Sequence, residues 1–507
     1  MKNQLKLGVV ISYMTTIVGI IINLIYTPLL TSLLGQTEYG LYTVVASVVN
    51  YLSLFSLGFG SAYLKYYSNY KVKNKQAEIC RLNGMFLVVF SFLAVCAFIT
   101  GMFLVKYAHI ILGSKINSNE LQTARVLMFI LVINIVLTFP SGVFNSIIVA
   151  HECYIFQRSI NLVSRIVNPL IVLPLLLAGY KSIAVVLVTT IITFSTLVIN
   201  IFYCFFRLHT KFLFKNLDFK ILKDIGKFSF FVFLNMVIDQ INWNVDKFLL
   251  IRFSGAAAVA IYGVASQINS LYLNFSTQIS SVFEPRVNQI VAKDNNDTNK
   301  VLTDLFTKVG RIQFMVIMLI LLGFIVFGQY FIQLWVGKDY ADAYLIILLL
   351  IVPVTIPLIQ NLGIEIQRAK NMHQFRSVIY FFVAVCNVVI SIPLTKSYGA
   401  VGSALGTAIS LLIGNCIVMN IYYHKKIGLD MFVFWKNILS FIPALLPSLI
   451  LGCIIEKFVS FDSIYIYLLF ILIFVFVYCI SIWKFGMNEQ EKKMITSFVQ
   501  RLKKNQK

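Results

Sequence analysis

Long apolar runs follow one another along the chain, separated by short polar gaps. Each run approaches or exceeds the roughly twenty residues that an α-helix needs to cross about 30 Å of hydrocarbon. Because the backbone must satisfy its own hydrogen bonds in lipid, such runs are expected to be helical. The pattern predicts an all-α integral membrane protein of about fourteen transmembrane helices, at residues 7–34, 39–64, 83–105, 124–150, 159–178, 182–206, 228–252, 256–284, 309–334, 343–366, 376–394, 400–424, 434–456 and 463–483.

Basic residues fall mainly in every second gap between these runs. Of the 42 Lys and Arg residues, 32 lie at the two termini and in alternate gaps, and only six lie in the other gaps. Because positively charged loops mark the cytoplasmic side of a membrane protein, this asymmetry predicts that both termini are cytoplasmic. The net charge of +22 therefore reflects topology, and no nucleic-acid partner is expected.

The composition excludes a soluble protein and offers little for catalysis. The chain is 59% hydrophobic and only 12% charged, whereas soluble domains carry about 25% charged residues. Its eight cysteines are scattered singly, without a CxxC motif, and its five histidines are also dispersed. No paired carboxylates, metal-ligand cluster, nucleophile elbow or phosphate-binding glycine loop stands out. We therefore expect neither a metal site nor an enzyme, and an integral membrane glycosyltransferase or polymerase is the least favoured alternative.

The chain also resembles itself at an offset near 219 residues. Leu29, Leu30, Gly35 and Tyr42 correspond to Leu249, Leu250, Gly255 and Tyr262. The repeated unit holds six spans, an even number, so both copies have the same orientation about an axis along the membrane normal. This predicts an N-terminal lobe at 1–212 (spans 1–6) and a C-terminal lobe at 213–427 (spans 7–12). Spans 13 and 14 and a basic cytoplasmic tail follow at 428–507.

Polar residues line one side of span 7. Asn235, Asp239, Asn242 and Asp246 sit at i, i+4, i+7 and i+11, which is one stripe of an α-helix. An ionised side chain at the bilayer centre costs about 2.5–3.5 kcal/mol even on the gentlest scale. We therefore expect the stripe to face a hydrated cavity, although polar contacts that join helices are an alternative. Spans 1, 2 and 8 add further candidates for the cavity wall: Asn23, Asn50, Gln267, Asn274 and Gln278.

The four basic residues that are not assigned to gaps lie inside the predicted spans or at their edges. Arg165 lies some 9 Å inside span 5, at about 1.5 Å per residue. Lys247 and Arg252 lie in the outer part of span 7, and Arg125 lies at the outer mouth of span 4. All four are candidate cavity cations. The alternative is that their side chains extend to the membrane interface, as long basic side chains often do.

Three stretches of sequence resemble a known family. Residues 26–68 (YTPLLTSLLGQTEYGLYTVVASVVNYLSLFSLGFGSAYLKYYS) are similar to the opening of bacterial Wzx-type polysaccharide flippases, which belong to the multidrug/oligosaccharidyl-lipid/polysaccharide exporter superfamily. Residues 245–268 (VDKFLLIRFSGAAAVAIYGVASQI) resemble the start of the second half of these proteins. Residues 398–410 (YGAVGSALGTAIS) resemble their twelfth span.

The resemblance implies fourteen spans, two six-helix lobes in a V and a central cavity open to one side at a time. It also implies a bacterial cytoplasmic (inner) membrane location and transfer of undecaprenyl-diphosphate-linked oligosaccharide from the cytoplasmic to the outer leaflet by alternating access. The product would be O-antigen, capsule or a related polymer, with a polysaccharide polymerase and chain-length machinery as partners. A drug or cation exporter of the same superfamily and a peptidoglycan-precursor flippase are the alternatives.

On this interpretation each group of polar residues has a role. Arg165, Lys247 and Arg252 would meet the diphosphate. The amides of the cavity wall, with the rings of Trp243 and Tyr262, would meet the sugars. Asp239 and Asp246 would bind H⁺ or Na⁺, or would balance Lys247. No cofactor is expected, and the sequence leaves open whether an H⁺ gradient, a Na⁺ gradient or the membrane potential drives turnover.

Overall fold

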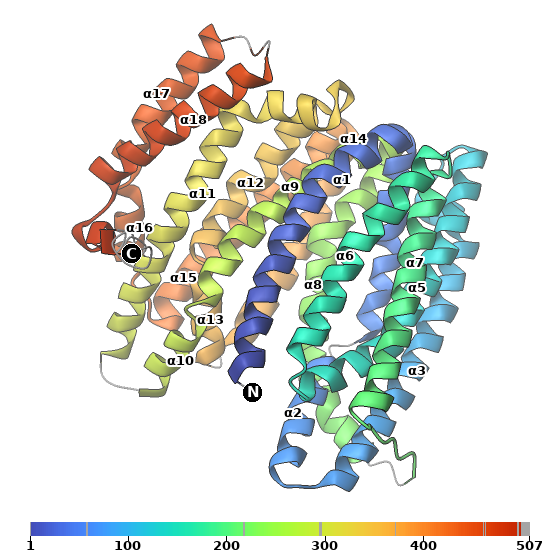
Figure 1. Ribbon diagram of the computed structural model, residues 1–507. Helices are drawn as coiled ribbons and strands as arrows, with labels where there is room; N and C mark the ends of the chain where they lie inside the picture. The colour runs from blue at the N-terminus through green and yellow to red at the C-terminus, as the bar shows by residue number, and fades with distance from the viewer. Residues whose placement is uncertain are drawn as a thin grey trace, which may run out of the picture. The chain divides into compact units, whose positions relative to one another are not determined.

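The computed structural model describes most of the 507 residues, and the residues that it describes are helical with no strand (Figure 1). They comprise residues 2–56, 59–215, 219–293, 297–370, 372–459, 461, 463–493 and 496–497. Most of the predicted basic tail, residues 498–507, lies outside this set.

The helices follow one another with short connections. The first half contains α1 (Lys2–Asn50), η1 (Tyr51–Ser56), α2 (Phe59–Val72), α3 (Gln76–Lys106), α4 (Ala108–Leu112), α5 (Ser118–Ala150), α6 (Tyr154–Leu177), α7 (Lys181–Phe202), η2 (Tyr203–Arg207) and α8 (Phe219–Phe253). The second half contains α9 (Ala256–Ser281), α10 (Glu284–Lys293), α11 (Thr298–Val336), η3 (Lys338–Tyr340), α12 (Ala343–Ile359), α13 (Leu362–Ala369), α14 (His373–Leu412), η4 (Ile413–Met419), α15 (Asn420–Tyr422), η5 (Tyr423–Ile427), α16 (Met431–Leu439), α17 (Ile442–Phe458), α18 (Ile464–Ser481) and η6 (Ile482–Gly486).

The all-α membrane class is confirmed. In the described part of the chain, ten helices are long and apolar enough to cross a membrane, or eleven if the bent pair α12 and α13 is counted as one span. Two of the ten are exceptionally long and contain a non-helical glycine, at Gly35 in α1 and at Gly399 in α14. At 49 and 40 residues, each has the length for two crossings. The total of fourteen crossings stays a prediction.

Six of the seven positive-φ glycines in the described residues lie in the gaps that carry few basic residues; the other is Gly428. Gly35, Gly113 and Gly179 have φ of 75°, 81° and 90°. Gly255, Gly337 and Gly399 follow them about 220 residues later, with φ of 90°, 99° and 57°. Side chains with a Cβ rarely adopt this backbone conformation, so glycine is the residue for these tight reversals. The spacing of about 220 residues seen in the sequence repeat therefore also appears in the backbone conformation.

The chain forms two compact units, and one segment from its second half belongs to the first unit. One unit contains Met1–Val264 and Ala384–Thr407, and the other contains Ala265–Val383 and Ala408–Lys507. In the first unit, α3 packs along α5, α5 along α7, and α1 along α6 (Figure 1). The division into lobes at 1–212, 213–427 and 428–507 rests on the sequence repeat and stays a prediction.

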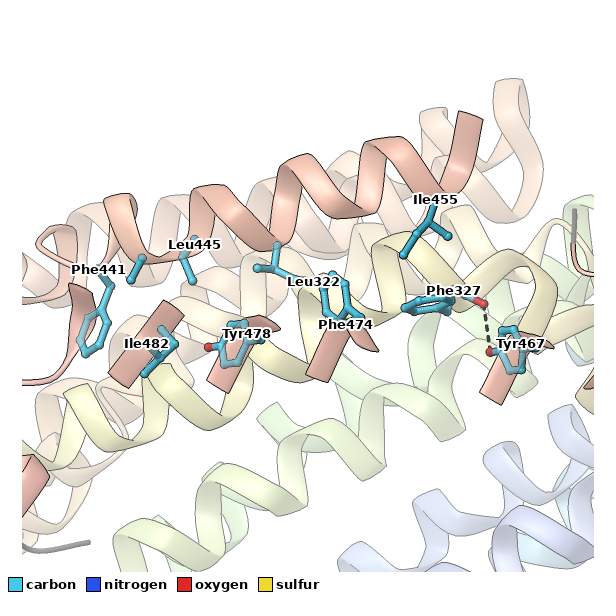
Figure 2. Close-up of a cluster of buried hydrophobic side chains, with 10 residues drawn as sticks. Leu322, Phe327, Phe441, Leu445, Ile455, Tyr467, Phe474, Tyr478 and Ile482 are labelled. Carbon is cyan, nitrogen blue, oxygen red and sulfur yellow. Dashed lines mark hydrogen bonds between the residues drawn. The ribbon is translucent and has the colours of Figure 1, made fainter. Parts of the chain in front are cut away.

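In the second unit, α17 and α18 pack on α11 through an apolar cluster. Figure 2 shows Leu322 and Phe327 of α11 among side chains from both helices. The Phe474 and Tyr467 rings of α18 meet the Phe327 ring edge-on, at centroid distances of 5.6 and 5.8 Å. The Tyr467 hydroxyl also donates a hydrogen bond to the carbonyl oxygen of Phe327 (3.3 Å). The helices of predicted spans 13 and 14 are therefore integral parts of this unit.

A buried ion pair fixes the chain after α18 to α11. Arg311 lies inside α11 and is 5% exposed. Its Nε and Nη2 atoms donate to the two carboxylate oxygens of Glu491 at 2.7 and 2.9 Å. Its remaining donors reach the carbonyl oxygens of Asn437 and Gly486 (2.8 Å each). The guanidinium also lies 4.3 Å from the centre of the Phe441 ring. Arg311 thus links three segments of the second unit.

The ion pair generates a stability prediction. Glu491→Gln keeps the shape of the side chain but leaves the Arg311 charge buried without its partner, which should cost about 3–5 kcal/mol. Glu489→Gln is the matched control, since Glu489 is 81% exposed and only pairs with Lys492 at 3.5 Å; its cost should be about 0–1 kcal/mol. Thermal unfolding in detergent measures both. Equal unfolding temperatures for the two variants would contradict a stabilising role for the buried pair.

Candidate functional site

The carboxylate of Asp246 is the most enclosed acidic group in the predicted polar stripe. Asp246 lies in α8 and is 1% exposed. Three hydroxyl groups donate hydrogen bonds to it. Ser403 donates to Oδ1 at 2.6 Å, while Tyr262 and Thr407 donate to Oδ2 at 2.6 and 3.0 Å. These donors stabilise the ionised form, because charge-assisted hydrogen bonds are stronger than neutral ones.

Asn387 and Ser391 lie behind the hydroxyl groups that contact the carboxylate. Asn387 is 1% exposed, and its Oδ1 atom accepts a hydrogen bond from Ser391 at 2.8 Å. The Thr407 hydroxyl oxygen lies 3.2 Å from the same atom. A hydroxyl has one proton, so Thr407 cannot donate to Asp246 and to Asn387 at once. If Thr407 donates to Asp246, two acceptor oxygens face each other beside the carboxylate.

Small residues bring these groups together. Ser403 and Thr407 follow Gly402 and Gly406 in the part of α14 after Gly399, whereas Asn387 and Ser391 lie in the part before it. A Cβ at Gly402 would overlap the backbone of Leu394, and one at Gly406 would overlap Ser391. The two parts of α14 therefore touch through glycine, as small residues allow between membrane helices. Tyr262 reaches the same carboxylate from α9.

Lys247 does not pair with Asp246. The structure has no salt bridge within 4 Å for either residue among the side chains that it describes. Neighbouring residues of a helix point in different directions, so a lysine at i+1 is poorly placed to reach the carboxylate. Lys247 itself is half-buried. In the described part of the chain, no group of three or more His, Cys, Asp and Glu side chains could hold a metal ion.

The rest of the predicted stripe differs in its surroundings. Asn242 is buried like Asp246, whereas Asp239 is exposed and Trp243 is half-buried. The side chain of Asn235 lies outside the described residues. The tyrosine hydroxyl of Tyr51, from η1, donates to the carbonyl oxygen of Gln240 at 3.2 Å. The part of α8 near Asp246 is thus packed against other helices of the first unit, whereas the helix surface at Asp239 is exposed.

Arg165 reaches the polar side of α1. Its Nη1 atom donates to the carbonyl oxygen of Thr15 at 3.3 Å, and its guanidinium occupies the space beside Gly19. The side chain remains exposed, as does Asn23 one turn further along α1. Arg165 is therefore an accessible cation within a helix that is long and apolar enough to span a membrane.

The other predicted cations lie elsewhere. Arg125 and Arg252 are both exposed, and the Arg252 stem lies against Gly113, in the connection between α4 and α5. Arg252 lies in the last turn of α8 and Arg125 in the second turn of α5, and no contact of the described residues joins either to Arg165. Their roles as cavity cations or interface residues stay predictions.

The amides of α9 and α1 divide between two environments. Asn274, Gln278 and Asn50 are exposed, and Gln267 is half-buried. The opposite face of α9 is buried: Tyr272 bonds Thr355 at 2.7 Å, and Ser276 donates to the carbonyl oxygen of Leu358 at 2.8 Å. This buried face holds α9 to α12 and leaves the exposed amides available for ligands.

Four residues of the Asp246 site were missed in the sequence: Asn387, Ser391, Ser403 and Thr407. Each pair has i, i+4 spacing, and the glycines precede the second pair. Ser403 and Thr407 lie within the stretch 398–410 that carries the family likeness, whereas Asn387 and Ser391 precede it. Hydroxyl residues are common in membrane helices, so the spacing alone does not identify a carboxylate partner about 140 to 160 residues away.

Together these features define a multi-pass helical membrane protein with a buried, hydroxyl-bonded carboxylate. The chain belongs to the polysaccharide biosynthesis protein family, whose sequence model matches residues 5–291. This confirms the resemblance to a polysaccharide family. Among curated proteins, it is 22% identical over 457 residues to the uncharacterized membrane protein EpsK of Bacillus subtilis (strain 168), covering 86% of each chain.

Solved structures share the fold. The lipid II flippase MurJ in an inward closed conformation superimposes with a TM-score of 0.72 at 20% identity, over 94% of this chain and 97% of MurJ. An inward-facing multidrug resistance MATE family transporter superimposes with a TM-score of 0.66 at 15% identity, over 85% of this chain and 99% of the transporter. At these identities the likeness shows the fold alone.

The glycine contact in α14 generates a prediction. Gly402→Ala should force the two parts of α14 apart, because its Cβ would overlap backbone atoms that cannot rotate away. Overpacking of this kind costs roughly 1–3 kcal/mol, and thermal unfolding in detergent should register it. Gly142→Ala is the matched control, since its Cβ would meet only a ring carbon of Phe90 at 3.7 Å. A Gly402→Ala protein as stable as the control would contradict the close contact.

Proposed function

We propose that this protein is a flippase for undecaprenyl-diphosphate-linked oligosaccharide, acting by alternating access in surface polysaccharide biosynthesis. Membership of the polysaccharide biosynthesis protein family carries the proposal. The placement of Arg165 supports it, because an exposed cation inside an apolar helix is costly unless it meets water or an anion. A lipid-linked diphosphate is an anion that enters the membrane with its carrier.

The headgroup would need more than one cation. Arg165 is the strongest candidate for the diphosphate, and Lys247, Arg252 and Arg125 are the further ones. The exposed amides of Asn23, Asn50, Asn274 and Gln278, with Gln267 and Asn235, would bind the sugars, and the Trp243 ring would stack on them. Asn242 is buried and has no place in this role. Tyr262 is instead committed to Asp246, where its hydroxyl donates at 2.6 Å. Transport on this account makes and breaks no covalent bond.

The proposed orientation follows from the basic residues. With 32 Lys and Arg residues at the termini and in alternate gaps, both termini would face the cytoplasm of a bacterium, in its cytoplasmic (inner) membrane. Substrate would then enter from the side on which lipid-linked oligosaccharides are built. A polysaccharide polymerase and chain-length machinery would act on the product at the outer leaflet.

Deletion of the gene in its native bacterium tests the transport step. The lipid-linked oligosaccharide should accumulate in the cytoplasmic leaflet, where its sugars are shielded from an oxidant or lectin that cannot cross the membrane. Surface polysaccharide should fall, and Arg165→Lys should restore more of it than Arg165→Gln, since lysine retains the charge. Normal surface polysaccharide and an outward-facing glycolipid in the deletion strain would refute the proposal when no second flippase is present.

The Asp246 site would couple transport to a cation gradient. A buried carboxylate beside hydroxyl and amide oxygens has the ligand chemistry of a hard cation, H⁺ or Na⁺. When the single hydroxyl proton of Thr407 bonds Asp246, the Thr407 hydroxyl oxygen and Asn387 Oδ1 lie 3.2 Å apart as two acceptors. A cation would bridge them. Binding would neutralise Asp246, and thereby change how strongly it holds the donors from α9 and α14.

Asp246→Asn provides the test of coupling. In proteoliposomes, an imposed H⁺ or Na⁺ gradient should accelerate flipping by the native protein at least tenfold more than by Asp246→Asn, because the amide has no charge to neutralise. Asp239→Asn is the control, since it makes the same change on the same helix at an exposed position. Unfolding temperatures identify any variant that fails to fold. A full gradient response in a folded Asp246→Asn protein would exclude Asp246 as the coupling site.

Two alternatives have a specific observation behind them. The MurJ likeness favours a peptidoglycan-precursor flippase, and the likeness to the multidrug transporter favours a drug or cation exporter. The site residues weigh against the exporter, because a path for organic cations should be acidic and Arg165 is an exposed cation. The peptidoglycan substrate shares the polyprenyl diphosphate and differs only in the sugar and peptide part.

A further inference from the structure

The segment that follows α7 and η2 lies along the beginning of α3 and is hydrogen-bonded to it. We call residues 208–215 the strap; in Figure 1 it is the green coil after α7. The backbone N–H of Leu213 donates to the carbonyl oxygen of Cys80, and that of Thr210 donates to Cys204, both at 3.0 Å. The side chain of Asn83 donates to the carbonyl oxygen of Lys211 at 3.1 Å. The strap is therefore held in place by hydrogen bonds within the first unit.

The side chains that hold the strap in place are buried. Asn83 is 2% exposed and accepts a hydrogen bond from the fully buried Tyr63 hydroxyl at 2.7 Å. The strap also passes over Gly84, where a Cβ would overlap the backbone of Leu213. These contacts use the backbone of the strap. The Phe212 ring packs on Phe144 and Phe205, whereas the side chains of Lys211, Phe214 and Lys215 are exposed.

An apolar groove of about 550 Å³ lies between the strap and α3. Leu87 and Cys80 of α3 form one wall, and Phe205, Lys211 and Phe214 lie on the other. Phe205 and Phe214 are 47% and 56% exposed. The two α3 residues are seven positions apart, about 10 Å along the helix, so the groove runs from the helix end into the apolar part of α3.

The charge at this groove is positive. Arg207, Lys211 and Lys215 recur every four residues, and the sequence has no acidic residue between Glu152 and Asp218. The acid on the first turn of α3, Glu78, is already paired with Arg81 at 2.9 Å. An apolar groove with a lysine on its wall, at the boundary of membrane-spanning helices, suits an amphiphilic anion.

We propose that this groove binds one anionic phospholipid of the surrounding bilayer. Its phosphate meets Lys211, with Arg207 and Lys215 nearby, and one acyl chain lies along Phe205, Leu87 and Phe214. The site is distinct from Asp246 and Arg165, and it requires only that this end of α3 lies at the membrane boundary. It holds for either orientation of the protein and independently of the transported substrate.

Native mass spectrometry of the full-length protein with phosphatidylglycerol or phosphatidylcholine tests the site. Lys211→Gln should weaken phosphatidylglycerol binding at least fivefold and leave phosphatidylcholine unchanged. The substitution keeps the Lys211 carbonyl that Asn83 binds, so the strap should stay in place. Lys106→Gln, at the other end of α3, is the matched control and should bind both lipids as the native protein does.

Phe214→Ser supplies a second variant, which should weaken both phospholipids by removing part of the apolar wall. Competition with undecaprenyl phosphate separates the two lipid sources. The proposal is overturned if Lys211→Gln binds phosphatidylglycerol as tightly as Lys106→Gln does. It is also overturned if undecaprenyl phosphate occupies the groove and phosphatidylglycerol does not displace it.

Discussion

A carboxylate inside a membrane-spanning bundle persists only where donors replace the water that it has lost, and Asp246 depends on this constraint. Three hydroxyl groups from two helices surround it. Ser403 and Thr407 follow the glycines Gly402 and Gly406, through which the two parts of α14 touch. The positive-φ glycine at 399 makes the reversal between these two parts possible. The position of one charge thus explains why glycine, serine and threonine occupy this part of the chain.

The second unit buries charge in a different way. Arg311 has a carboxylate partner, two backbone carbonyl oxygens and an aromatic ring around its guanidinium. Its donors are occupied and its charge is balanced, which is the expected state of a structural ion pair. Asp246 has hydroxyl donors but no ion-pair partner among the described residues. That difference is why Arg311 has a structural role and why a cation-binding role is proposed for Asp246.

The sequence predicted the fold class well and the site only in part. Hydropathy alone predicts the helices, because lipid leaves the backbone no other way to satisfy its hydrogen bonds. The polar stripe in α8 identified Asp246 as costly in lipid. It did not reveal that Ser403 and Thr407 are its partners, since such contacts depend on how distant helices pack. Arg311 shows the same limit: it lies at the start of the predicted span 309–334, and only the packing of α11 shows that it is buried and paired with Glu491.

The most direct measurement is the binding of ligand to the purified protein in nanodiscs. A fluorescent undecaprenyl-diphosphate-linked oligosaccharide should bind, be displaced by its unlabelled form, and bind at least tenfold more weakly to Arg165→Gln. A hydrophobic organic cation such as ethidium should neither bind nor compete. Saturable binding of the cation, together with no binding of the glycolipid, would contradict the account and favour an exporter.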